Sequence, residues 1–320
     1  MPVTTPPHDA GLRPWHAEAW DRLQARRDRD ALPHALLLAG PAGLGKRDFL
    51  SVFVRGLLCL QPIDGVACGQ CRSCHLLAAG THPDRVTLSF GLRKDGVTRS
   101  EIVVDQIRDL SQRLAMSSQF GGWQVATVDP ADAMNAAAAN ALLKTLEEPT
   151  PATLMVLVAD EPARLPATIR SRCQRVDFLV PSREVSLAWL AAQGVADAPA
   201  ALEAAGGNPG MAREWAADGA LRQRDEVRKD LRALAAGRGD AMEVIKRWQA
   251  AQPARYLWFA AQAVADELRA RTAGMPVPLE SQLDDEALDQ WYGRANRARD
   301  ALRGPLRVDL ILLELLAAWR

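Results

Sequence analysis

The sequence lacks a surplus of charge, because 39 Lys and Arg residues balance 39 Asp and Glu residues among 320. A protein that holds nucleic acid by itself usually carries a basic excess, so this balance disfavours a stand-alone DNA-binding protein. The sequence also lacks an apolar run near the roughly 20 residues that span a bilayer, and its first residues lack the pattern of a secretory signal. From these absences we expect a cytoplasmic protein that makes no contact with a membrane.

The overall composition is that of a folded chain. Hydrophobic residues make up 48% and charged residues 24% of the sequence, a profile that disordered proteins do not have. At roughly 100–200 residues per domain, the length allows two or three domains.

Cysteine is scarce, yet four of the five cysteines lie close together in the sequence, at Cys59, Cys68, Cys71 and Cys74. In a reducing cytosol, clustered thiols serve as metal ligands more often than as disulfides. Four thiolates complete the tetrahedral shell of zinc and leave no position for a catalytic water, so we predict a structural Zn²⁺ site. The alternative is a set of free or redox-active thiols. Cys173 lies outside the cluster and is predicted to be a small core residue.

Short apolar runs alternate with amphipathic helices in the first half of the chain. The runs predict buried strands, and the intervening segments predict helices that cover a parallel sheet on both faces, which makes the fold class α/β. The predicted strands are residues 35–39, 86–89, 123–128 and 154–159, and the predicted helices are residues 15–29, 47–60, 103–116 and 135–147.

Beyond about residue 181 the strand pattern stops. Three short helices are expected within residues 182–217, followed by longer amphipathic helices at about 220–236, 240–251, 254–272, 284–302 and 305–319. The sequence therefore predicts three parts, namely an α/β domain over residues 1–180 that includes the cysteine module, a small helical unit over 181–218 and an all-helical domain over 219–320.

A glycine-rich segment follows the first predicted strand and precedes a helix. Residues 40–46 read GPAGLGK, which supplies Gly40, Gly43, Gly45 and Lys46. In this context glycines let backbone N–H groups surround a phosphate, and the lysine and the helix N-terminus add positive charge. A chance glycine-rich turn is the weaker alternative, so we predict a phosphate-binding loop.

Two groups that a working nucleotide hydrolase needs are missing. Arg47 stands where a Ser or Thr hydroxyl would ligate Mg²⁺. After the predicted strand at residues 123–128, Asp129 is present as a metal-shell carboxylate, but Pro130 stands where a Glu would polarise the attacking water. The sequence predicts a degenerate nucleotide site in which ATP binding is retained as an option and hydrolysis is lost.

Several motifs occur in an order that resembles a known family. They are HALLL at residues 34–38, the phosphate loop, the four cysteines, NALLKTLEEP at 140–149 and SRC at 171–173. Over roughly residues 12–180 the chain resembles the bacterial DNA polymerase III clamp-loader subunits of the AAA+ class, and among them the delta-prime group. Beyond that range the resemblance is architectural, with residues 181–218 as the lid and 219–320 as the collar through which subunits assemble.

The resemblance implies a function and partners. Such a subunit helps to load a ring-shaped sliding clamp onto primed DNA, together with gamma or tau and delta subunits, as part of a DNA-directed DNA polymerase (nucleotidyltransferase) holoenzyme. It implies a non-hydrolysing stator without catalysis of its own. An active gamma/tau-like ATPase motor is the alternative, and a zinc-module DNA-binding protein with a vestigial nucleotide fold is a third reading that the zero net charge disfavours.

The resemblance also implies a role for Arg172, which would act in trans on the nucleotide of a neighbouring ATPase subunit. Charge stabilisation by an arginine supplied in this way is worth about 10³–10⁵ in rate. A salt-bridged surface arginine is the alternative interpretation. Glu147 and Glu148, at the end of a predicted helix, are interpreted as interface or capping residues and not as catalytic carboxylates.

Overall fold

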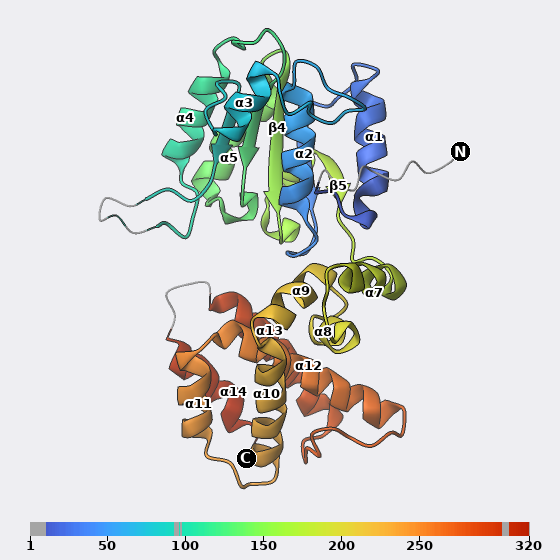
Figure 1. Cartoon of the computed structure of the whole chain (residues 1–320). Helices are drawn as coiled ribbons and strands as arrows, with labels where there is room; N and C mark the ends of the chain where they lie inside the picture. Colours follow the sequence, from blue (N-terminus) through green and yellow to red (C-terminus); the bar gives the residue numbers. More distant parts are fainter. Residues whose placement is uncertain (1–10, 93–95, 97, 303–306, 320) are drawn as a thin grey trace. The chain divides into compact units, whose positions relative to one another are not determined.

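The computed structural model describes residues 11–92, 96, 98–302 and 307–319. It divides into two compact units, residues 1–185 and residues 186–320, and each is described by itself (Figure 1). Residues 1–10 of the first predicted domain and residues 305–306 of the last predicted helix lie outside the described residues. Within the described residues, no helix is both long enough and apolar enough to cross a membrane.

The first unit is built on a five-stranded sheet in which all paired strands run parallel, as the sequence predicted. The order across the sheet is β2-β3-β4-β1-β5. The strands are β1 (Ala35–Ala39), β2 (Arg85–Leu88), β3 (Gln124–Val128), β4 (Thr153–Ala159) and β5 (Gln174–Asp177). The edge strand β5 was not predicted from the sequence.

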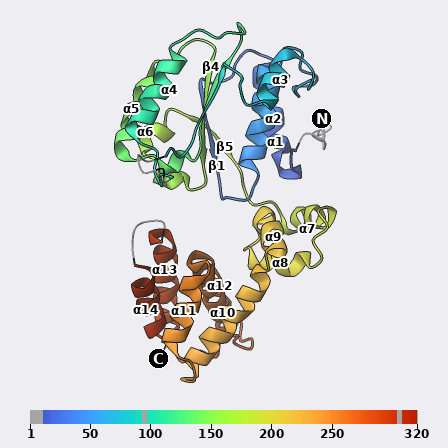
Figure 2. The same cartoon turned by 60° about the vertical axis from the view of Figure 1, so that its left-hand side comes forward.

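Continuous apolar strands give the sheet two buried faces. Along β1, Leu36 and Leu38 join one hydrophobic core, whereas Leu37 and the two flanking alanines join the other. Figure 2 shows the two helical layers on opposite sides of the sheet. One layer contains α1 (Ala17–Arg27), α2 (Lys46–Leu58) and α3 (Arg72–Ala78), and the other contains α4 (Val104–Leu114), α5 (Ala136–Glu147) and α6 (Ala167–Arg170).

The parallel arrangement separates two edges of this sheet. The carboxyl ends of β1, β3 and β4 meet at one edge, where the chain continues into the phosphate loop, Asp129 and Asp160. The segment that leads into β5 starts from the opposite edge, since Gln174 pairs with Leu36 near the beginning of β1. Five residues of strand span about 16 Å, so groups at the two edges are far apart.

The second unit is helical throughout its described residues, and one hydrophobic core runs through it from Leu190 to Trp319. Its helices are α7 (Arg183–Ala192), whose first turn belongs to the other unit, α8 (Ala198–Ala204), α9 (Pro209–Ala217), α10 (Ala220–Ala235), α11 (Ala241–Ala250), α12 (Pro253–Thr272), α13 (Asp285–Ala301) and α14 (Val308–Ala317). The core combines residues on both sides of position 218, and the division into lid and collar stays a prediction.

Candidate functional site

The glycine-rich segment forms a tight loop between β1 and α2. Gly40, Gly43 and Gly45 all have positive φ angles, of 147°, 84° and 81°. A Cβ atom at Gly40 would lie 2.1 Å from the carbonyl oxygen of Phe178, and one at Gly45 would lie 2.5 Å from the Arg13 Nε. Only glycine fits these two positions, and a glycine-rich turn of this kind before a helix is the backbone shape that binds phosphate; the Gly40 N–H itself donates to the Ala159 carbonyl oxygen at 3.3 Å.

Lys46 lies at the start of α2 and is 2% exposed. Its Nζ donates to the carbonyl oxygens of Gly40 at 2.6 Å and Pro41 at 2.8 Å, and it lies 2.5 Å from Asp160 Oδ1. Burial lowers the pKa of Lys46, and the contact with Asp160 opposes that shift. The three ammonium hydrogens are therefore matched by three oxygen acceptors within the chain.

Asp160 is a site residue that the sequence analysis missed. It follows β4, and because Ala39 pairs with Ala159, Gly40 and Asp160 leave their strands side by side. Burial would raise the pKa of Asp160, but hydrogen bonds from Lys46 and Arg47 outweigh it and hold the pKa below its usual range. The sequence feature that could have revealed Asp160 is its position directly after the predicted strand at residues 154–159.

Arg47 contacts both carboxylates at this edge of the sheet. Its Nε lies 2.8 Å from Asp129 Oδ2 and its Nη2 lies 2.7 Å from Asp129 Oδ1, which is a bidentate pair. The same Nη2 lies 3.1 Å from Asp160 Oδ2. The carboxylates of Asp129 and Asp160 are thus bridged by one guanidinium. A third nearby acidic residue, Asp132, makes a different contact, because its Oδ2 accepts the backbone N–H of Glu161 at 2.7 Å.

A short N-terminal segment holds the phosphate loop from outside. Trp15 Nε1 donates to the Leu44 carbonyl oxygen at 2.9 Å, and Arg13 Nη1 donates to that of Gly43 at 2.5 Å. His16 Nδ1 accepts the Arg13 N–H, so its Nε2 donates to Leu44 at 2.8 Å. Burial lowers the pKa of His16 to about 4, which keeps the ring neutral. This support was not predicted from the sequence.

The four clustered cysteines come together, as their spacing predicted. All four Sγ atoms lie within 4.8 Å of one another. Cys59 follows α2, Cys68 lies in the connecting loop, Cys71 is the N-cap residue of α3 and Cys74 lies in its first turn. The Sγ separations include 3.5 Å for Cys59–Cys68, 3.6 Å for Cys59–Cys74 and 4.0 Å for Cys68–Cys74. Four sulfurs about 2.3 Å from one tetrahedral ion would lie about 3.8 Å apart, so the thiols fit a metal ion.

A hydrogen-bonded pair ties this cluster to the rest of the unit. Ser73, between two of the cysteines, donates to the Leu58 carbonyl oxygen at 2.6 Å, and its Oγ lies 3.0 Å from His82 Nε2. His82 Nδ1 accepts the Asp84 N–H at 3.2 Å, so Nε2 is the donor toward Ser73. Ser73 and His82 are both buried, so they fix the two cysteine-bearing segments against each other.

Arg172 lies just before β5, at the opposite edge of the sheet from the phosphate loop. Its Nη2 is 2.6 Å from Glu147 Oε1, and its Nη1 donates to the Thr168 carbonyl oxygen at 3.0 Å. The Arg172 side chain is 36% exposed and that of Glu147 49%. Cys173 is buried, as expected of a core residue, and burial raises the pKa of its thiol to about 12.

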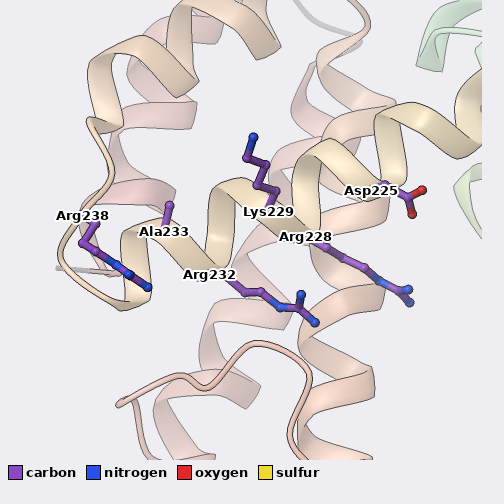
Figure 3. Close-up of a pocket in the computed structure, with 6 residues that line it drawn as sticks. All are labelled: Asp225, Arg228, Lys229, Arg232, Ala233 and Arg238. Carbon is purple, nitrogen blue, oxygen red and sulfur yellow. The ribbon is translucent and has the colours of Figure 1, made fainter.

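A cavity of about 480 Å³ lies along α10 in the second unit (Figure 3). Its lining is mostly cationic and comprises Asp225, Arg228, Lys229, Arg232, Ala233 and Arg238. In Figure 3, Lys229 leaves one side of the helix and Arg228 and Arg232 the other. Arg228 is also paired with Asp266 at 2.9 Å. These charges do not converge on one ligand, and we assign the cavity no function.

The parallel sheet, the loop of residues 40–46 and the carboxylates at the ends of β3 and β4 define a P-loop fold of the AAA+ class. A family model described as "DNA polymerase III, delta subunit" matches residues 15–182. The chain is 39% identical to the delta-prime subunit of DNA polymerase III from Pseudomonas aeruginosa, over 78% of this chain and 75% of that protein. The chain belongs to the delta-prime family of DNA polymerase III subunits, which confirms the predicted resemblance.

Two further similarities accompany this assignment. The delta-prime subunit of Haemophilus influenzae is 37% identical over 67% of this chain and 64% of its own length. Among solved structures, a DNA polymerase III gamma subunit-related protein of Thermotoga maritima is 16% identical, with a TM-score of 0.45 over 95% of this chain and 98% of that chain.

Proposed function

We propose that this chain is a non-hydrolysing clamp-loader subunit that acts through contacts with its neighbours. The observation that carries the proposal is the bridge from Arg47 to Asp129 and Asp160, because it occupies the carboxylates that a hydrolase would use for Mg²⁺ and water. The family relatives are named as subunits of DNA polymerase III, which supports assembly with other subunits. In this role the chain works in the cytoplasm, beside gamma or tau and delta subunits, to load a sliding clamp onto primed DNA.

Arg172 would serve a neighbour's nucleotide and not the chain's own. It precedes Gln174, which pairs with Leu36, whereas the phosphate loop begins at Gly40 beyond the other end of β1. The separation along the strand direction is on the order of 20 Å, which is longer than an arginine side chain. Arg172 can therefore meet a triphosphate only on a second subunit, where its planar cation would stabilise charge on the transferring phosphoryl group.

The metal of the cysteine cluster would be zinc in a structural role. Four thiolates are the donor set of closed structural zinc sites, and four of the Sγ–Sγ separations, at 3.5–4.0 Å, suit tetrahedral coordination, with all pairs within 4.8 Å. Bound zinc would supply folding free energy and no catalysis. Cys59, Cys68, Cys71 and Cys74 would hold it. The hydrogen bond from Ser73 to the Leu58 carbonyl oxygen keeps the start of α3 close to Cys59, and His82 holds Ser73 in place.

The helical second unit would carry the lid and the collar. Residues 181–218 correspond to the lid and residues 219–320 to the collar through which subunits assemble. The shared hydrophobic core of this unit supports a rigid body, since helices α8 to α14 all contribute buried side chains to it.

An active gamma/tau-like motor is the alternative, and the retained glycines and Lys46 are the features that favour it. We expect the isolated chain to release no phosphate from ATP above the rate of a Lys46→Ala control, because Arg47 replaces the metal-binding hydroxyl and Pro130 replaces the carboxylate base. A phosphate-release assay with and without Mg²⁺ measures this. Steady turnover in the natural chain that disappears in Lys46→Ala would establish the motor instead.

The ion pair between Glu147 and Arg172 should affect ATP hydrolysis by the assembled complex. Arg172 must leave Glu147 to reach a neighbour, and an exposed pair of this kind is worth about 0.2–1 kcal/mol. Glu147→Gln should therefore raise ATP hydrolysis at the one site that receives Arg172 by up to about fivefold, measured in single-turnover experiments on the reconstituted complex, whereas Glu148→Gln, at the adjacent exposed position, should not. A fall to the rate of an Arg172→Ala complex would mean that Glu147 holds Arg172 in its working position.

A further inference from the structure

The P-loop fold implies a Mg²⁺ ion between the residue after the loop lysine and the carboxylate at the end of β3. The residues at this position do not fit that ion. Mg²⁺ requires a near-octahedral shell of oxygen ligands at about 2.0–2.1 Å, and the hydroxyl that would complete it is replaced by the guanidinium of Arg47. Both nearby carboxylates already accept from Arg47, with the shortest contacts at 2.7 Å to Asp129 and 3.1 Å to Asp160.

The charges at this position also argue against a bound Mg²⁺ ion. Two cations, Lys46 and Arg47, face two carboxylates, Asp129 and Asp160, so the cluster is neutral as it stands. A divalent cation would add two positive charges beside a guanidinium, although Asp129 and Asp160 are already paired with Arg47 and Lys46. Hydrogen bonds from Lys46 and Arg47 hold the pKa of Asp160 below its usual range, so the pairing persists through neutral pH.

The phosphate-binding part of the site is nevertheless intact. The three glycines have positive φ angles, as a loop that wraps its backbone around an anion requires, and the 13-residue helix α2 begins at the loop. Two of the three contacts of Lys46 Nζ are to the carbonyl oxygens of Gly40 and Pro41, which phosphate oxygens could replace while Asp160 stays paired. Arg47 is 47% exposed, so one side of its guanidinium is open to a ligand.

We propose that Arg47 replaces Mg²⁺ in this site and that the loop takes the phosphates of a nucleoside di- or triphosphate in their metal-free form. The guanidinium ties the ends of β3 and β4 to the start of α2, as a metal ion would, and presents the one N–H of Nη1 that no carboxylate accepts to the outer phosphate. This inference deepens the proposed non-hydrolysing function and rests on it, because a site without Mg²⁺ binds but does not turn over.

The test is calorimetric titration of the full-length chain with ADP and with ATP, once in EDTA and once in excess Mg²⁺. We expect binding in EDTA that Mg²⁺ weakens at least about tenfold, because chelation removes the metal-free nucleotide. Lys46→Ala should abolish it. A chain that binds only with Mg²⁺, or that binds neither nucleotide in EDTA, overturns the proposal.

Variants of Arg47 assign the effect to this residue. Arg47→Ser restores the hydroxyl and frees Asp129, while Asp160 keeps its pair with Lys46, so Mg²⁺ should strengthen nucleotide binding by this variant instead of weakening it. Arg55→Ser, an exposed position further along α2, is the matched control and should behave as the natural chain does. Thermal melts of both variants check folding, and Arg47→Gln serves as a second variant that removes the charge. If Arg47→Ser keeps the Mg²⁺ response of the natural chain, Arg47 is not the replacement. ATP hydrolysis, measured separately, reports on the proposed function and not on this inference.

Discussion

Replacing Cys71 by Ser is expected to release the metal from the cysteine cluster and to destabilise the α/β unit. Structural zinc sites in peptides carry apparent binding free energies of about 10–16 kcal/mol at neutral pH, and removal of one thiolate forfeits a large part of that. Cys71 also accepts the Cys74 N–H at 3.4 Å, so the start of α3 loses support. A loss of about 3 kcal/mol would lower the melting midpoint by about 6–12 °C for a unit of this size.

Metal analysis and a thermal melt measure this effect together. Cys173→Ser is the matched control, because Cys173 is buried but lies outside the cluster. That variant should keep one metal ion per chain and lose at most the free energy of burying one hydroxyl, about 1–3 kcal/mol. Freshly purified natural protein with almost no bound metal would contradict the zinc assignment directly.

Replacing Arg172 by Ala should have the largest effect on activity, and only within the assembled complex. At the nucleotide site that receives Arg172, hydrolysis is expected to fall by about 10³–10⁵, the range measured for arginines supplied across an interface. Sites served by other subunits should continue, so total turnover should fall by the share of one site. Single-turnover ATP hydrolysis by the reconstituted complex separates the slow site from the others.

The structure predicts that Arg172→Ala leaves the fold intact. The pair with Glu147 is partly exposed on both sides and is worth at most about 1 kcal/mol. Arg170→Ala, on the neighbouring helix α6 and also exposed, is the control that should leave hydrolysis unchanged. Arg172→Lys should restore little, since an ammonium lacks the planar fork of a guanidinium. Unchanged turnover in the Arg172→Ala complex would remove the role in trans.

The central strands could be predicted from the sequence because their burial is continuous. Every residue of β1, β3 and β4 is buried, so each strand reads as an unbroken run between turn residues. The edge strand β5 was not predicted because only Val176 of its four residues is buried. The strand therefore has no apolar run and is too short for an alternating pattern to be recognised. Tertiary pairing with β1 makes it a strand.

The sequence predicted only those parts of the candidate site that lie within contiguous motifs. The phosphate loop, Arg47 and the cysteines are contiguous motifs, and contiguity is visible in one sequence. Asp160 depends on strand order, since β4 lies between β3 and β1, and no local pattern encodes that order. The contacts of Trp15 and His16 with Leu44 likewise depend on how a distant segment packs, and the sequence predicted only a helix there.

The phosphate loop and Arg172 lie at opposite edges of the same sheet, and this polarity constrains how subunits line up. Domains that meet through unlike edges associate head to tail, and a head-to-tail row that does not close has two different ends. A subunit that donates an arginine but hydrolyses no ATP itself does not need an arginine from the subunit on its other side. Under the proposed function, this chain would therefore occupy one end of such a row, where its carboxylates stay bridged by Arg47 while neighbouring subunits hydrolyse ATP.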